Sequence, residues 1–194
     1  MGATLNIFLA AILTHNIALV YILGMCPTIG VSKSLRTAMG MGVAVIFVVT
    51  LTSLINWLIY NLVLIPTGSE IIALLVFIIT IAATVQLVEM LLEKYAPFLY
   101  VSFGIFLPLI TVNCAVLGVT LFMVLREYTL AQSLLFALGS SAGFFLAISL
   151  VAGIREKLEL IGDIPRGLQG QGIVMVILGI IALGFMGFGG MVDL

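Results

Sequence analysis

Long apolar segments, separated by short polar ones, make up almost the whole chain. Formal charges are confined to a few places, and five stretches carry none at all: 1–32, 37–69, 95–125, 128–154 and 167–192. Each stretch has room for a helix of about 20 residues, the length that crosses the hydrocarbon core of a bilayer. The stretches do not alternate apolar and polar residues as barrel strands do, so the pattern predicts membrane-spanning helices.

We place six spans along the chain, at 4–26, 38–63, 71–92, 98–124, 130–153 and 171–191. The connections between them are short, and the longest, 154–170, holds a cluster of charged residues. The predicted fold is an all-α integral membrane protein of six transmembrane helices, with residues 1–194 forming a single membrane domain.

Composition supports lipid as the surrounding medium. The 194 residues are 63% hydrophobic and 8% charged, whereas soluble domains carry about 25% charged residues. A chain with so few polar side chains cannot cover a water-facing surface, so we expect it to lie in a lipid bilayer. Its seven Lys and Arg are dispersed, and we expect no nucleic-acid partner.

The basic residues predict the orientation of the chain in the membrane. Only Arg126 follows an even-numbered span, and the other six basic residues follow spans 1, 3 and 5: Lys33, Arg36, Lys94, Arg155, Lys157 and Arg166. Basic residues gather in cytoplasmic loops. We therefore expect the loops after spans 1, 3 and 5 in the cytoplasm and both termini outside.

A short internal repeat surrounds the two cysteines. The pattern C-x-x-x-G-V runs from Cys26 to Val31 and again from Cys114 to Val119, 88 residues later. Because three spans separate the two copies, the halves, approximately 1–93 and 94–194, would cross the membrane in opposite directions. Inverted repeats of this kind are common in transporters, where special sites lie near the midplane.

Both cysteine segments contain residues that interrupt helices. Pro27 cannot donate a backbone hydrogen bond, and it disfavours the helical conformation at Cys26. Glycines and a second proline flank the two cysteines: Gly24, Gly30, Gly104, Pro108 and Gly118. Non-helical backbone at membrane depth is tolerated where protein or a cavity shelters it. We therefore predict that spans 1 and 4 are interrupted near the cysteines, with both thiols facing the protein interior.

Three interpretations are open for Cys26 and Cys114 from the residues alone. A membrane cysteine can be a small packing residue, and the pair could form a disulfide, although that would be unusual within hydrocarbon. Thiolates are also the ligands of iron–sulfur clusters. A [2Fe–2S] cluster takes four thiolates and this chain supplies two, so ligation would need a second chain to bring the others.

Three runs carry a resemblance to a known family: LGMCPTIGVSK at 23–33, GIFLPLITVNCAVLG at 104–118 and GIREKL at 153–158. Over essentially its whole length the chain resembles the RnfA/NqrE family. The resemblance implies a membrane component of one of two ion-translocating complexes in the cytoplasmic membrane of a bacterium or archaeon. These are the Rnf complex, a ferredoxin:NAD⁺ oxidoreductase, and the sodium-pumping NADH:quinone oxidoreductase.

The same resemblance implies a cofactor and partners. Family members pair with a paralogous six-helix subunit, RnfE- or NqrD-like, of opposite orientation. The two are understood to hold an intramembrane [2Fe–2S] cluster through two cysteines each, and Cys26 and Cys114 match those positions. Other Rnf subunits, which carry flavins and iron–sulfur clusters, are implied as further partners.

The two complexes are distinguished by short segments only. Cys26-Pro27 and the short connection between spans 2 and 3 resemble RnfA of the Rnf complex, which is our main hypothesis: an electron relay coupled to Na⁺ or H⁺ translocation. Residues 153–157 and 165–170 also resemble NqrE of the sodium-translocating quinone reductase, and this complex is the alternative.

Glu89 and Asn113 are the polar residues of greatest interest. Glu89 lies in the otherwise apolar third span, where a charge is costly and seldom idle, and its context resembles a family acid on a sodium path. It could equally belong to a terminal turn that reaches the headgroups. Asn113 could donate a hydrogen bond toward a cluster sulfur and tune its potential, or bond to a neighbouring helix.

The sequence contains no residues suited to hydride transfer or hydrolysis, and no nucleotide or flavin fingerprint. We therefore expect a component of an oxidoreductase complex that has no complete active site of its own. Two hypotheses of another class are a small secondary transporter, which inverted repeats and broken helices would also fit, and a non-redox scaffold.

Overall fold

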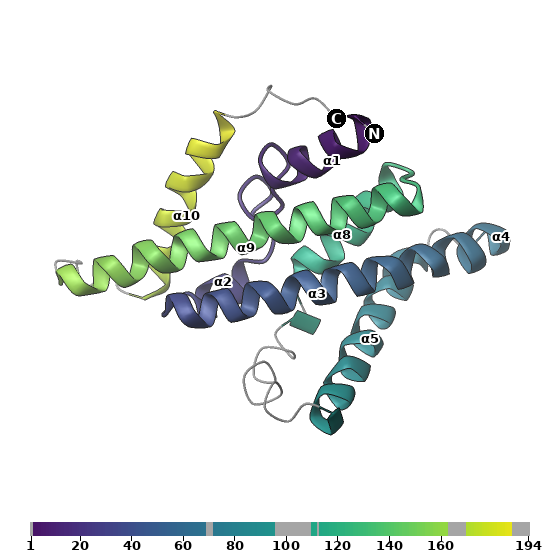
Figure 1. Ribbon diagram of the computed structural model, residues 1–194, viewed down its shortest axis with the longest axis horizontal. Coiled ribbons are helices and arrows are strands. Elements are labelled where there is room, and N and C mark those ends of the chain that lie inside the picture. Colours follow the sequence, from purple (N-terminus) through teal and green to yellow (C-terminus); the bar gives the residue numbers. More distant parts are fainter. Residues whose placement is uncertain (1, 69–71, 96–109, 112, 163–169, 188–194) are drawn as a thin grey trace.

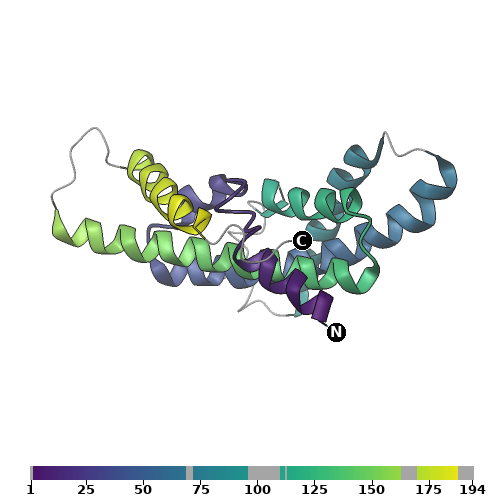
Figure 2. The same cartoon turned by 90° about the horizontal axis from the view of Figure 1, so that it is seen from above.

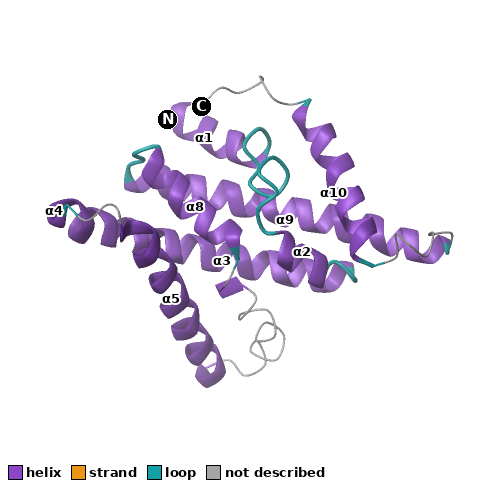
Figure 3. Cartoon of the chain, turned by 180° about the vertical axis from the view of Figure 1, so that it is seen from behind, coloured by secondary structure: helices purple, strands orange, loops and turns teal. Residues whose placement is uncertain are grey.

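The computed structural model describes residues 2–68, 72–95, 110–111, 113–162 and 170–187, and each regular element in these ranges is a helix (Figure 3). In chain order the elements are α1 (Gly2–Ile12), α2 (Met25–Val31), α3 (Leu35–Ile59), the π-helix η1 (Tyr60–Leu64), α4 (Ile65–Thr67), α5 (Ala73–Tyr95), α8 (Cys114–Leu125), α9 (Leu130–Ile161) and α10 (Gln171–Met186).

Within the described residues, three helices are long and apolar enough to cross a membrane: Leu35–Leu64, Ala73–Leu91 and Leu130–Ile161. Two shorter apolar helices, Cys114–Leu125 and Gln171–Met186, overlap the fourth and sixth predicted spans. The prediction of an all-helical protein with membrane-spanning segments is thus confirmed for part of the chain. The first half of the fourth predicted span, to residue 109, lies outside the described residues.

The core is formed by α3 and α9, which run side by side in opposite directions (Figures 1 and 2). At one end, the backbone N–H of Leu35 donates to Glu156 Oε2 at 3.1 Å. At the other, Trp57 Nε1 donates to the carbonyl of Tyr128 at 3.0 Å, just before α9 begins. Between these ends the ring of Phe145 lies directly on Gly42, where a Cβ atom would collide with it.

Helix α1 lies on α9 at two glycines one turn apart. A Cβ added to Gly139 would lie 2.8 Å from the carbonyl oxygen of Phe8, and one added to Gly143 would lie 2.9 Å from Asn16 Nδ2. Small residues four apart let two helix backbones approach closely in a membrane, where the apolar lipid offers little hydrophobic drive for association. The Gly139–Gly143 pair therefore sets the distance between α1 and α9.

Helix α9 is longer than its hydrophobic pattern predicts. The pattern places the fifth span at 130–153 with a connection from 154, whereas the helix continues to Ile161. Arg155 and Glu159 form an i,i+4 ion pair of 3.3 Å within the added turns, which favours helix. Gly162 then ends the helix in the left-handed conformation, with φ 77°, as a C-terminal glycine commonly does.

Candidate functional site

The first cysteine lies where the chain resumes a helix after a long break. Helix α1 ends at Ile12 and α2 begins at Met25, so the predicted span 4–26 is interrupted. Gly24 precedes α2 with φ 85°, and a Cβ at that position would lie 2.6 Å from the Phe144 ring. Both the backbone conformation and the close approach therefore require glycine.

Pro27 fits this arrangement because of where the helix starts. It occupies the third position of α2, within the first turn, where a backbone N–H has no partner inside the helix. Proline therefore costs α2 no hydrogen bond, whereas it would break a helix that continued through Cys26. The Cys26-Pro27 pair is thus compatible with a helix start and incompatible with an unbroken span.

The second cysteine is the first residue of α8. Asn113 caps this helix: its Oδ1 accepts a hydrogen bond from the backbone N–H of Ala115 at 3.0 Å, as an N-cap asparagine does. Asn113 is 3% exposed, and its amide nitrogen Nδ2 has no partner among the described residues. Asn113 is thus non-helical and α8 begins at Cys114, in agreement with an interruption at this cysteine, whereas residues 98–109 and 112 of the predicted fourth span lie outside the described residues.

A hydrogen bond joins the two cysteine segments. The backbone N–H of Gly24 donates to Cys114 Sγ at 2.9 Å, across 90 residues of sequence. The neighbouring Leu23 lies over Gly118, where a Cβ would come within 2.6 Å of the Leu23 side chain. The hydrogen bond and this contact together fix the Cys114 sulfur beside the start of α2.

Both thiols are free and exposed in the single chain. The prediction that they face the interior of this chain is therefore wrong. Each lies in the first turn of its helix, where side chains lean toward the N-terminal end of the helix. No described group of three or more His, Cys, Asp or Glu residues could hold a metal ion. The chain thus provides two accessible sulfurs, which is half of the donor set of a [2Fe–2S] cluster.

Asn16 stabilises the break between α1 and α2. It is fully buried, and its Oδ1 accepts hydrogen bonds from the backbone N–H groups of Ala18 and Leu19 at 3.0 and 3.3 Å. Its Nδ2 donates to the carbonyls of Ile12 and Gly143, both at 3.0 Å. One side chain thus satisfies backbone groups that the interrupted helix leaves open, which a bilayer interior requires. The sequence alone does not single out this role.

Glu89 lies on α5. It is half-buried, at the boundary between the buried Val85 and Val88 and the exposed Gln86 and Glu93. In Figure 1 the C-terminal end of α5 points away from the α3–α9 pair. Among the described residues, no hydrogen bond or ion pair joins Glu89 to Cys26 or Cys114.

The comparisons with known proteins agree with one another. A family model described as "Rnf-Nqr subunit, membrane protein" matches residues 4–192. Three similar proteins are named as the E subunit of the Na(+)-translocating NADH-quinone reductase. The one from Maridesulfovibrio salexigens is 47% identical, with 98% of each chain covered. Those from Marinobacter nauticus and Alcanivorax borkumensis are 46% and 48% identical, with 96% of each chain covered.

Proposed function

This chain belongs to the Rnf-Nqr family of membrane subunits, within the RnfA/NqrE group, and from that premise we propose that it is the NqrE component of a sodium-translocating NADH:quinone oxidoreductase in a bacterial membrane. Support comes from relatives of that name at 46–48% identity, with at least 96% of both chains covered. These relatives favour the quinone reductase over the Rnf complex, which was the main hypothesis from the sequence.

In this proposal Cys26 and Cys114 are two of four thiolate ligands to a [2Fe–2S] cluster. The observation that carries it is the Gly24 N–H to Cys114 Sγ hydrogen bond, which ties the two cysteine segments together, with both thiols free and exposed. The other two thiolates come from a paralogous, NqrD-like subunit of opposite orientation. When bound, such a cluster supplies one-electron transfer, and the remaining subunits of the complex supply its donor and acceptor.

Asn113 belongs to the surroundings of this site in the same proposal. Its Oδ1 is engaged in the helix cap, while the buried Nδ2 is an unused donor one residue from Cys114. A hydrogen bond from Nδ2 toward a sulfur would stabilise the reduced, more negative state and raise the reduction potential.

We further propose six spans arranged as inverted repeats, approximately 1–93 and 94–194, within a single membrane domain, and both termini outside. The support is the repeated C-x-x-x-G-V pattern and the start of a helix at each cysteine. Glu89 is proposed to lie on the cation path, because it is a half-buried carboxylate within an apolar helix.

Electron paramagnetic resonance on the purified, reduced complex tests the ligand proposal. We expect a [2Fe–2S] signal that Cys26→Ser and Cys114→Ser each abolish. Met90→Leu, which removes an exposed sulfur from α5, should leave the signal intact. Asn113→Ser keeps a capping oxygen and should lower the midpoint potential of the same signal.

The outcomes separate the competing functions. Full electron transfer in Cys26→Ser would contradict the ligand proposal and favour a scaffold. Solute flux through the isolated chain, without a cluster signal from the complex, would favour a secondary transporter.

A further inference from the structure

We propose that Arg155 is a positioning residue for Cys26, holding the short helix α2 so that the thiol is presented in a fixed place. The ligand role of Cys26 comes from the proposed function, whereas the hold of Arg155 on α2 is a separate claim with its own measurement. The sequence alone places Arg155 in a cytoplasmic connection, and the structure places it inside α9.

Arg155 is 5% exposed, and its contacts reach far along the chain. Its Nη1 donates to the carbonyl of Ile29 at 3.3 Å and to Ser32 Oγ at 3.1 Å, across 126 and 123 residues. Its Nε donates to Glu159 Oε1 at 3.3 Å on the same helix. Two of the three contacts thus lie at the C-terminal end of α2.

Helix α2 needs such a contact because it is short. It has seven residues, well below the length at which a helix is stable by itself. The last four carbonyls of a helix have no partner within it, and that of Ile29 is one of them. A buried guanidinium satisfies this carbonyl and places positive charge at the negative end of the helix.

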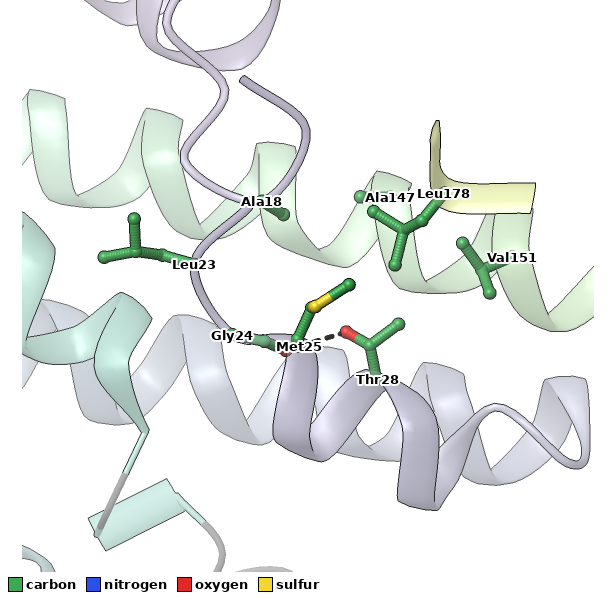
Figure 4. Close-up of a pocket in the computed structure, with 8 residues that line it drawn as sticks. All are labelled: Ala18, Leu23, Gly24, Met25, Thr28, Ala147, Val151 and Leu178. Atoms are coloured by element: carbon green, nitrogen blue, oxygen red, sulfur yellow. Dashed lines mark hydrogen bonds between the residues drawn. The ribbon is translucent and has the colours of Figure 1, made fainter. Parts of the chain in front are cut away.

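Side-chain packing leaves a small gap beside the first turn of α2. A small apolar cavity lies beside its first turn, lined by Met25 and Thr28 of α2, by Ala147 and Val151 of α9, and by Leu178 of α10 (Figure 4). Atoms that face a void lose dispersion contacts on that side. The packing of α2 on α9 and α10 is therefore incomplete beside its first turn, although Pro27, Thr28 and Val31 are buried.

Hydrogen bonds at the two ends of α2 add to this packing. At the start, the N–H of Gly24 donates to Cys114 Sγ, and at the end Arg155 holds Ile29 and Ser32. Loss of the second contact frees the C-terminal end and lets the turn that carries Cys26 shift. Removing one partner of a buried, charged hydrogen bond also leaves the others unsatisfied.

Hydrogen–deuterium exchange on the assembled complex measures this hold directly. In Arg155→Met we expect amides in peptides covering α2 to exchange roughly tenfold faster or more, the size expected for a lost charged hydrogen bond. Peptides covering α5 should not change. Lys157→Met is the matched control, because Lys157 is exposed on the same helix. In this variant the amides of α2 should exchange at the wild-type rate.

Two milder variants keep the test decisive if Arg155→Met does not assemble. Arg155→Lys retains one charged donor and should restore most of the protection of α2. Ser32→Ala removes a single acceptor and should raise exchange in the same peptides by a smaller factor. Wild-type protection of α2 in Arg155→Met, or in Ser32→Ala where Arg155→Met does not assemble, would overturn the positioning role.

The cluster signal distinguishes this inference from the proposed function. Arg155→Met should reduce the intensity of the [2Fe–2S] signal or shift its g values, and Arg155→Lys should reverse most of the change. A wild-type complex without any cluster signal would contradict the proposed function, and the exchange measurement would still decide whether Arg155 holds α2.

Discussion

Single residues explain why each cysteine lies at the start of a helix. Pro27 is acceptable only in a first turn, and Asn113 provides the oxygen that caps α8. Gly24 takes a left-handed conformation next to the Phe144 ring. Each of these features concerns one position, yet together they determine where the two sulfur atoms lie.

Glu89 offers a prediction at this scale. Glu89→Gln keeps the side chain's size and removes its charge, so a cation on this path would lose an ionic partner. We expect quinone reduction to need about tenfold more sodium for half-maximal rate, corresponding to about 1.4 kcal/mol. Glu93→Gln, exposed one turn further along α5, should leave the sodium titration unchanged. A wild-type titration in Glu89→Gln would remove Glu89 from the path.

Local residue chemistry was the predictable part of the site. Gly24, Cys26, Pro27 and Gly30 indicate a break and a candidate ligand from the sequence alone. The sequence could not show that Gly24 donates to Cys114 or that Arg155 reaches Ile29, because both contacts join residues at least 90 positions apart. The role of Asn16 was equally out of reach, because it depends on burial and on the carbonyl of Gly143, 127 residues away.

At the scale of elements, helix ends and helix contacts follow different rules. Hydrophobicity places the body of α9 correctly but ends it eight residues early, because charged residues in its last turns still favour helix through the Arg155–Glu159 pair. The close contact of α1 with Gly139 and Gly143 of α9 depends on the absence of a side chain at two positions, which a hydrophobic pattern does not show.

The glycines of α9 give a matched pair of substitutions. Gly139→Ala places a methyl group 2.8 Å from the backbone oxygen of Phe8, so α1 must move. We expect the free energy of unfolding to fall by about 1–3 kcal/mol. The methyl group added by Gly153→Ala, on the same helix, has no neighbour within 4 Å. Because alanine has the higher helix propensity, the free energy of unfolding should rise by about 0.5–1 kcal/mol. The thermal midpoint of the purified complex should fall in the first variant and not in the second. Equal midpoints would show that α1 and α9 are not in close contact.

At the scale of the whole molecule, the chain exposes far more apolar surface than a soluble monomer would. Large side chains face outward along α5 and α10, including Ile79 at 67% and Leu183 at 71% exposure. Extended apolar surface of this kind marks contact with lipid or with other subunits. The described fold therefore matches the membrane prediction made from composition.

Orientation is the prediction that belongs to the whole chain. Six of its seven basic residues follow odd-numbered spans, which places both termini outside. An epitope tag at either end should be cleaved by protease added to spheroplasts, whereas a tag inserted after Ser34 should be protected until the membrane is permeabilised. Cleavage at Ser34 with protection of both ends would reverse the orientation.

The contacts of α2 also bear on the order in which the chain can be built during translation. The contact at its start needs Cys114, and the contact at its end needs Arg155, which is synthesised 126 residues after Ile29. The segment bearing Cys26 therefore leaves the ribosome long before either anchor exists. It can reach its final position only once the end of α9 has emerged, so a shorter nascent chain cannot yet present Cys26 and Cys114 as the proposed pair of ligands.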